Sequence, residues 1–240
     1  MVVESSLEDP ERKRLLAQYA EIATLAGGLA HEIKNPLSTI GINLELMAEE
    51  IAESELPRAR LLLKKIQTIQ QECGHLEEIL NAFLQFARVG QMELVRADLN
   101  QLLREFIDFY QPQAKDHGID VSPHLDPDIP ETPLDRSLMR QVLMNLALNA
   151  QHAMPEGGLL ELQTSVRDGR VCLDFIDNGT GMNERVLSKM FQAFFSTKSE
   201  GSGLGLATVR KIVEAHHGTI SCESELGRGT RFSISLPAAR

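Results

Sequence analysis

The stretch LLELQTSVRDGRVCLDFID, residues 159–177, decides how the second half of the chain folds. Two apolar-rich runs flank the dipeptide Asp168-Gly169, a pair that favours a tight turn. The pattern predicts two antiparallel strands joined as a β-hairpin. The stretch HGTISCESELGRGTRFSISL, residues 217–236, has the same form and predicts another strand pair.

Helical patterns surround these hairpins. The spacing predicts helices over 137–154 and 204–217, and a third helix that Asp98 or Asn100 caps and that runs to about Lys115. The run IDVSPHL before the long helix is a strand candidate despite its proline. Helices gathered against a mostly antiparallel sheet predict a two-layer α/β sandwich.

The first half has a different period. Residues 11–88 read as helical, with one apolar stripe up to Ile51 and a second from Leu62 to Ala87. The segment ESELP supplies the turn between them, and its Pro57 opens the second helix. Such an antiparallel hairpin does not bury both stripes by itself, so we expect two copies to pair as a four-helix bundle in a homodimer.

The fold class expected is therefore α plus α/β, with the change of pattern near Gly90. We expect a helical dimerisation hairpin over 1–90, a linker over 91–98 and an α/β domain over 99–240. The net charge of −10 argues against nucleic-acid binding. No apolar run is long enough to span a membrane, so we expect no membrane contact from this chain. Three scattered cysteines and a polar N-terminus predict a cytoplasmic protein.

The stretch GGLAHEIKNPLSTI, residues 27–40, places a histidine off the apolar stripe of the first helix. Glu32 can fix the tautomer of His31 and leave its other ring nitrogen as a nucleophile. Asn35 shares the side of His31, and Pro36 predicts a kink there, which we interpret as a hinge together with the linker. A solvated helix face is the alternative reading. A phosphoryl-accepting histidine also requires an ATP site elsewhere in the chain.

Several motifs of the second half offer that site. Asn145 and Asn149 lie four residues apart on one helix side and suit a magnesium ion bound with a triphosphate, although capping or solvation would also explain them. In DNGTGM, Asp177 ends a strand, while Gly179 and Gly181 let the backbone approach a flat ligand; a simple turn is the alternative.

The stretch GSGLGLA leads directly into a helix and suits phosphates. Glycines and a helix N-terminus expose N–H groups to an anion, and the glycines here are Gly201, Gly203 and Gly205, with Leu204 between the last two. Lys198 in the preceding polar segment is either a phosphate partner or a solvated charge. Phe191, Phe194 and Phe195 either pack in the core or form the hinge of a lid. Thr230 either belongs to a tight turn between strands or helps to line a pocket for the base.

The order of these motifs resembles that of the sensor histidine kinases of two-component signalling, over about residues 20–237. HEIKNPL is similar to the phosphoacceptor box, NLALNA to the N box, DNGTGM to the G1 box, FQAFF to the F box and GSGLGLA to the G2 box. The resemblance implies an ATP-binding domain of the gyrase, chaperone and histidine-kinase type. The short lid with FFSTK resembles the nitrogen-regulation branch.

The resemblance also implies roles. His31 attacks the γ-phosphate of ATP, with Glu32 as its base, and the phosphoryl group passes to an aspartate of a response regulator. Asn35 orients a water in a reverse phosphatase reaction. Asn149 and Asn145 hold Mg²⁺ and Asp177 binds the adenine amino group. The phosphate residues are Lys198 and the GSGLGLA glycines.

Two alternatives to a kinase stay open. One is a gyrase-like or chaperone-like ATPase without phosphohistidine, and the other is a non-catalytic dimeric scaffold. Members of the family usually carry a sensor domain before the hairpin, whereas only about 20 residues precede this motif. We therefore expect a catalytic fragment or a separate sensor partner.

Overall fold

The computed structural model describes residues 33–34, 37–49, 51, 57–88, 92–198 and 202–239. His31, Glu32, Asn35, the Pro36 kink and Gly201 lie outside the described residues. The chain divides into two units, Met1–Gly90 and Gln91–Arg240. No helix in the described ranges combines the length and the apolar character needed to cross a bilayer.

The first unit contains a helical segment at 37–49 and the long helix α2, Pro57–Arg88, which begins at the predicted proline. Leu37 and Leu44 of the first segment and Ile66 of α2 are buried. The Ser38 hydroxyl donates to Glu77 across the pair at 3.4 Å. Many other apolar side chains of this unit remain exposed: Ile33, Ile40, Ile42, Leu46, Met47, Leu62, Ile69 and Leu76.

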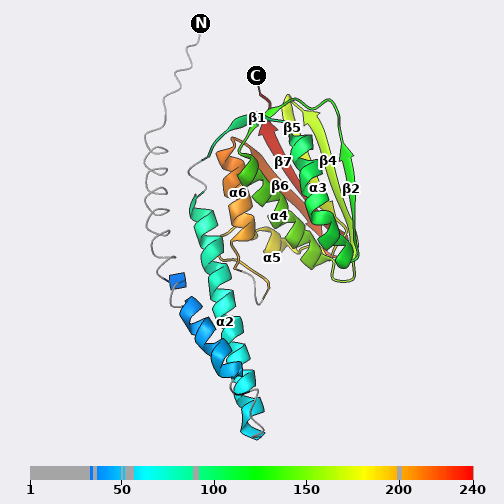
Figure 1. Ribbon diagram of the computed structural model, residues 1–240. Coiled ribbons are helices and arrows are strands. Elements are labelled where there is room, and N and C mark those ends of the chain that lie inside the picture. Colours follow the sequence, from blue (N-terminus) through cyan, green and yellow to red (C-terminus); the bar gives the residue numbers. More distant parts are fainter. Residues whose placement is uncertain are drawn as a thin grey trace. The chain divides into compact units, whose positions relative to one another are not determined.

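The second unit is built on a five-stranded sheet of order β2-β4-β5-β7-β6 (Figure 1). The strands are β2 (Ile119–Leu125), β4 (Gly158–Arg167), β5 (Arg170–Asp177), β6 (Thr219–Glu225) and β7 (Gly229–Pro237). All neighbouring pairs are antiparallel except β2 and β4, which are parallel. A parallel pair needs a crossover, and the helix between these two strands supplies it. This sheet confirms both predicted hairpins and the mostly antiparallel arrangement.

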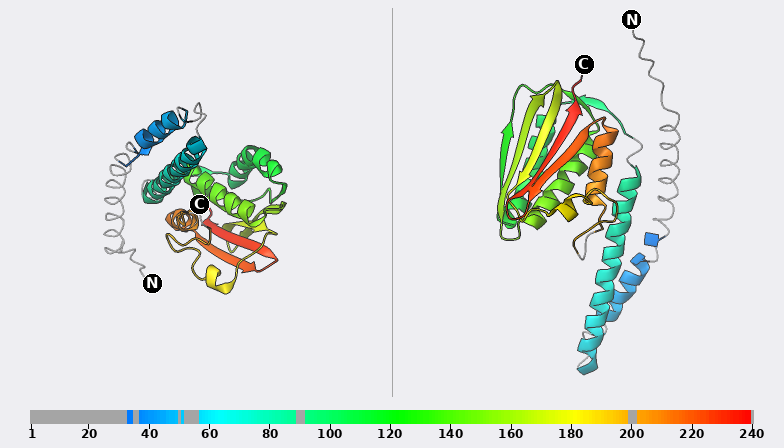
Figure 2. Two further views of the ribbon diagram at one scale, coloured as in Figure 1. Left: turned by 90° about the horizontal axis from the view of Figure 1, so that it is seen from below. Right: turned by 180° about the vertical axis from the view of Figure 1, so that it is seen from behind.

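Helices cover one face of this sheet, as the views from two sides show (Figure 2). They are α3 (Leu99–Asp116), α4 (Arg136–Ala153) and α6 (Gly205–Ala215), and the short α5 (Glu184–Leu187) precedes the loop that leads to α6. Asp98 caps α3, because its carboxylate accepts the Asn100 N–H at 2.7 Å. The two predicted layers are therefore present.

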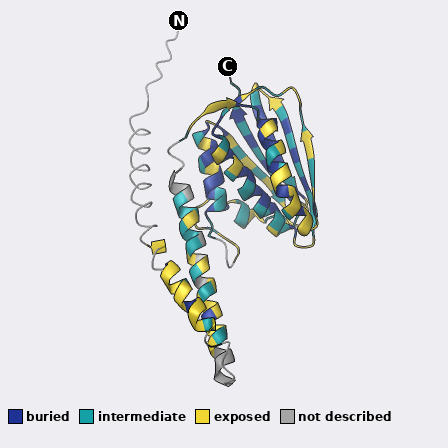
Figure 3. Ribbon diagram, in the orientation of Figure 1, coloured by how far each residue is buried: buried dark blue, intermediate teal, exposed yellow. Residues whose placement is uncertain are grey.

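The core lies between the helices and the sheet, where the dark blue positions gather (Figure 3). Its large, fully buried side chains come from both layers: Leu102, Leu103, Phe106, Tyr110, Met139, Leu143, Leu146, Leu160, Leu162 and Phe175. The opposite face of the sheet is polar, as expected for an antiparallel sheet with one solvated face.

Part of the predicted linker forms a strand instead. Within 91–98, β1 (Val95–Ala97) pairs antiparallel with β3 (Thr132–Leu134) in a separate two-stranded sheet. This pairing ties the segment to the second unit. The sequence analysis did not expect a strand within this linker, because the pairing depends on a contact with a strand some 35 residues later and not on the local sequence.

A buried histidine joins α6 to the start of α4. His216 follows α6, and its Nε2 accepts the Asp135 backbone N–H at 2.9 Å while its Nδ1 donates to the Ile212 carbonyl oxygen at 2.8 Å. Asp135 is in turn the N-cap of α4, with its carboxylate accepting the N–H groups of Ser137 and Leu138. One imidazole thus satisfies a buried donor and a buried acceptor.

We expect His216→Leu to lower the free energy of unfolding by about 1–3 kcal/mol, because the Asp135 N–H then remains buried without an acceptor. Urea unfolding followed by circular dichroism measures this change. His217→Asn is the matched control, since His217 is exposed and has a positive φ of 56° that Asn tolerates. Equal stability of the two variants would contradict the role of His216.

Candidate functional site

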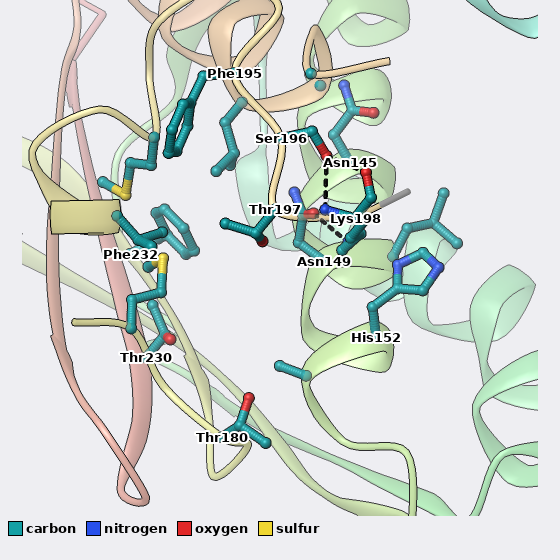
Figure 4. Close-up of a pocket in the computed structure, with 18 of the residues that line it drawn as sticks. Asn145, Asn149, His152, Thr180, Phe195, Ser196, Thr197, Lys198, Thr230 and Phe232 are labelled. Atoms are coloured by element: carbon teal, nitrogen blue, oxygen red, sulfur yellow. Dashed lines mark hydrogen bonds between the residues drawn. The ribbon is translucent and has the colours of Figure 1, made fainter. Parts of the chain in front are cut away.

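A pocket of about 410 Å³ opens in the second unit between α4, the ends of β5 and β7, and the loop before α6 (Figure 4). Both apolar and polar side chains line this pocket. The apolar lining is Leu148, Ala153, Met182, Val186, Met190, Phe195, Leu206 and Phe232. This size and composition are typical of small-molecule sites.

Most of the predicted site residues of the second half meet at this pocket. The lining includes Asn145, Asn149, Asp177, Gly181, Lys198, Gly203, Gly205 and Thr230. Gly179 and Leu204 are not among the lining residues, and the Leu204 side chain is fully buried. The Leu204 side chain packs in the core, and Gly179 and Leu204 stay predicted ATP-binding residues.

Asp177 is the only carboxylate among the described residues that line the pocket. It ends β5, is 6% exposed, and accepts the Gly179 N–H at 3.0 Å. Burial raises the pKa of Asp177, and backbone hydrogen bonds from Gly179 and Thr230 partly oppose this effect. A buried carboxylate with acceptor capacity left is suited to bind an amino group of a ligand.

A hydroxyl pair beside Asp177 connects two loops. Thr230 faces Asp177 in the β5–β7 register, and its Oγ1 lies 3.0 Å from the Ser224 Oγ. Ser224 accepts the Met182 N–H at 2.8 Å and donates to the Gly229 carbonyl oxygen at 2.9 Å. The loop after β5 is thus fixed to the β6–β7 hairpin, and Thr230 lines the pocket rather than serving the turn alone.

Gly181 is required by the close approach of these loops. Its φ is +66°, and a Cβ atom built there would overlap the Glu225 carbonyl oxygen. Both the backbone conformation and the space exclude a side chain. The DNGTGM motif therefore needs glycine at this position for backbone packing beside the pocket.

We expect Gly181→Ala to destabilise the protein by about 2 kcal/mol more than Gly169→Ala. Gly169 is the matched control because its φ is also positive, at +71°, but no atom lies within 4 Å of a Cβ built there. Strain alone affects Gly169, whereas strain and overlap both affect Gly181. Urea unfolding of both variants measures the difference, and equal losses would contradict the packing argument.

The opposite end of the pocket carries donors and a cation. Helix α6 begins at Gly205, and no side chain of the described residues caps its N-terminus, so its first N–H groups are available to an anion. Gly203, which precedes it, has a φ of +67°, and a Cβ there would lie 2.5 Å from the Phe194 carbonyl carbon. This turn brings the loop backbone to the start of α6.

Lys198 lies at this same end of the pocket, across from Thr180 and Thr230 (Figure 4). Its ammonium donates to the Asn149 Oδ1 at 3.2 Å. Loss of solvent lowers the pKa of Lys198, although its side chain keeps part of its surface exposed. The amide oxygen of Asn149 is thus turned toward a cation in this structure.

The donor set limits what kind of metal site the pocket can form. No group of three or more His, Cys, Asp and Glu suited to a metal ion occurs among the described residues. Asn145 and Asn149 provide neutral amide oxygens, and the Asn149 oxygen accepts a hydrogen bond from the Lys198 ammonium. A hard divalent ion fits these amides only if the ligand supplies further oxygens.

The three phenylalanines of the F-box stretch have different environments. Phe191 stacks edge-to-face on Phe232, with ring centroids 6.5 Å apart, and the Arg210 guanidinium lies 6.0 Å from its ring. Phe195 lines the pocket. Phe194 is 65% exposed with a φ of +64°, so this residue does not pack in the core. Core packing therefore does not explain all three phenylalanines, because Phe194 is exposed and Phe195 lines the pocket.

Sequence reasoning missed several lining residues. Thr180, Ser196, Thr197, Ser202 and His152 line the pocket but were not singled out. His152 was detectable, because it follows Asn149 by three residues on α4 and a helix places such residues side by side. The hydroxyl residues carry no comparable spacing signal.

Family comparisons account for both units. Residues 134–240 match the family described as histidine kinase-, DNA gyrase B- and HSP90-like ATPase, and residues 21–91 match the His kinase A (phospho-acceptor) domain. The chain belongs to the sensor histidine kinases of two-component signalling. The family's phosphoacceptor region includes the HEIKNPL stretch with His31, and its ATPase region includes the pocket.

Individual proteins similar to this chain are also histidine kinases. The chain is 34% identical to the sensor histidine kinase ZraS of Klebsiella oxytoca over 89% of its own length and 45% of ZraS. Full-length ShkA in complex with AMPPNP is similar in structure, with a TM-score of 0.69, 29% identity, and coverage of 90% of this chain and 46% of ShkA. The histidine kinase ThkA in complex with the response regulator TrrA gives a TM-score of 0.67 at 27% identity, covering 98% of this chain and 67% of ThkA. The chain thus spans less than half of ZraS and ShkA.

Proposed function

We propose that the chain is an ATP-dependent protein histidine kinase that phosphorylates His31 and transfers the phosphoryl group to an aspartate of a response regulator. The observation that carries this proposal is that the two ends of the pocket differ in their polar groups. One end has a buried carboxylate beside two glycine turns, and the other end has Lys198, two amides and an uncapped helix N-terminus. An adenine nucleotide matches both ends, because the amino group of its base suits the carboxylate and its anionic phosphates suit the cation and the N–H groups.

The orientation of ATP follows from these two ends. The Asp177 carboxylate accepts the adenine amino group, and Thr230 and Gly181 border the base. The phosphates lie toward the N-terminus of α6, with Gly203, Gly205 and Lys198 around them. We include Gly201 among the phosphate-binding residues because it belongs to the GSGLGLA motif. ShkA binds AMPPNP, which supports the same ligand class for this chain.

Mg²⁺ fits the pocket when ATP is present. Asn149 and Asn145 would hold it with phosphate oxygens and waters, and Asn149 is the more direct ligand because its oxygen already accepts a cation. The ion would supply charge neutralisation at the phosphates. Lys198 must leave the Asn149 oxygen for this ligation, and it is then available to pair with a phosphate.

The chemistry at the histidine follows from its residue types. A neutral imidazole has a nucleophilic nitrogen, and Glu32 takes or orients the proton on the other nitrogen. Positioning and charge neutralisation supply most of the rate in phosphoryl transfer. We include a phosphatase reaction in the proposal, in which Asn35 orients a water toward the phosphoaspartate of the regulator.

The assembly we propose is a homodimer through the helical hairpin of residues 1–90. The exposed apolar side chains on both helices of this unit support it, because a second hairpin would cover them. Residues 99–240 would be the catalytic ATP-binding domain, connected through 91–98. A response regulator is the expected partner, as ThkA is seen with TrrA. We place the protein in the cytoplasm, with its signal from a sensor segment or partner.

The test is incubation with ATP labelled at the γ-phosphate. We expect protein-bound label that is stable in base and lost in acid, as for phosphohistidine, and that moves to a receiver domain from a panel. Mass spectrometry of the labelled peptide should locate it at His31. ATP hydrolysis without protein label would instead support a gyrase-like or chaperone-like ATPase, and nucleotide binding without turnover would support a dimeric scaffold.

A further inference from the structure

Ser224 of β6 has no role in the proposed function so far, although it contacts a residue at the base end of the pocket. Its Oγ lies 3.0 Å from the Oγ1 of Thr230, which lines the pocket and faces Asp177 in the β5–β7 register (Figure 4). Ser224 is not among the lining residues. Any effect of its hydroxyl on a ligand therefore passes through Thr230.

Three hydrogen bonds meet at the Ser224 hydroxyl. Its oxygen accepts the Met182 N–H at 2.8 Å, and the Gly229 carbonyl oxygen lies 2.9 Å away. A carbonyl oxygen accepts and does not donate, so the single hydroxyl hydrogen of Ser224 goes to Gly229. The Thr230 hydroxyl must then donate its own hydrogen to Ser224, which accepts it with its remaining lone pair.

This direction leaves the Thr230 hydroxyl with only lone pairs to offer a ligand. Thr230 is 6% exposed, so an unmatched polar group of a ligand at this place has little access to water. The Asp177 carboxylate beside it also accepts hydrogen bonds. A purine with an amino group can donate to these acceptors, whereas a purine with a carbonyl oxygen at the same position leaves them unpaired.

We propose that Ser224 is a positioning residue for the choice of base, because it takes the Thr230 hydrogen and so holds the Thr230 hydroxyl as an acceptor. This inference rests on the proposed nucleotide binding and adds base selectivity to it. Without the Ser224 hydroxyl, the Thr230 hydroxyl is free to turn and to donate to a carbonyl oxygen on the base. A nucleotide with that oxygen, such as inosine diphosphate, then becomes a better ligand relative to ADP.

The experiment is calorimetric titration of the whole chain with ADP and with inosine diphosphate, both in the presence of Mg²⁺. The measured quantity is the Kd for inosine diphosphate divided by the Kd for ADP, and wild type should favour ADP. Ser224→Ala should reduce this ratio by about fivefold, the effect of one net hydrogen bond. The loss of the acceptor for the Met182 N–H should weaken both nucleotides by the same factor, so it cancels in the ratio. A purely structural role would therefore leave the ratio as in wild type.

Two further variants separate the hydroxyl pair from the strand. In a Thr230→Val background, Ser224→Ala should leave the ratio unchanged, because no threonine hydroxyl remains to be released. Ser221→Ala is the matched control, since Ser221 is an exposed serine of β6 that faces the other side of the sheet. It should keep the wild-type ratio.

A measurement on wild type does not depend on the folding of any variant. The Thr230 hydroxyl proton should exchange slowly with water in NMR spectra of the free protein, because Ser224 accepts it. An unchanged ratio in Ser224→Ala, or a rapidly exchanging Thr230 hydroxyl proton, would overturn the inference. Absence of ADP binding by wild type would instead overturn the proposed function.

Discussion

His31→Gln is expected to abolish the acid-labile protein label and to leave nucleotide affinity unchanged. Glutamine keeps a polar side chain of similar length but has no nucleophilic nitrogen, so no phosphoramidate bond can form. All residues that line the pocket belong to the stretch from Asn145 to Phe232, so the substitution removes no described pocket contact. Labelling with γ-labelled ATP and ADP titration measure the two properties, and we expect at least a 1,000-fold loss in the first, on the order of the effect of removing a catalytic nucleophile.

The matched control for this variant is His124→Gln, which removes an exposed histidine of the second unit. It should be labelled as wild type is. Persistent label in His31→Gln would move the acceptor to another residue and refute the assignment. Loss of both label and ADP binding would indicate that the substitution damages the fold.

Asp177→Asn is expected to weaken adenine nucleotide binding by about 100-fold, since a buried carboxylate that accepts a hydrogen bond is replaced by a group that also presents donors. The same substitution should stabilise the free protein at neutral pH. Burial raises the pKa of Asp177 above its unfolded value, so the native state binds the proton more tightly and loses stability as the pH rises through this interval. An amide removes that penalty and still accepts the Gly179 N–H. Nucleotide binding should also weaken as the pH falls through the pKa of Asp177.

Asp174→Asn is the matched control, because Asp174 is a buried aspartate of the same strand that faces the other side of the sheet. It accepts from Arg167 at 2.7 Å and does not line the pocket. We expect it to lower stability and to leave nucleotide affinity unchanged, the reverse of Asp177→Asn. Calorimetric ADP titration and urea unfolding test both variants. Equal ADP affinity in Asp177→Asn and wild type would exclude the carboxylate as the adenine contact.

The sequence determined those features that depend on neighbouring residues. The β4–β5 hairpin forms where Asp168-Gly169 predicts it, and both residues have positive φ, 53° and 71°, because the dipeptide tolerates that conformation. Asp98 caps α3 and Pro57 begins α2 for equally local reasons. The spacing of the glycines and asparagines also predicted most of the pocket lining.

Only the tertiary structure decided the contacts between residues far apart in the chain. The three-residue strands β1 and β3 are too short to produce a period, and Pro133 argues against a strand, yet pairing stabilises both. Lys198 reaches Asn149 across 49 residues, and His152 becomes a pocket residue only because the loop before α6 returns to α4. Turn chemistry and periodicity act over a few residues, whereas the position of a side chain in a pocket depends on how the layers pack.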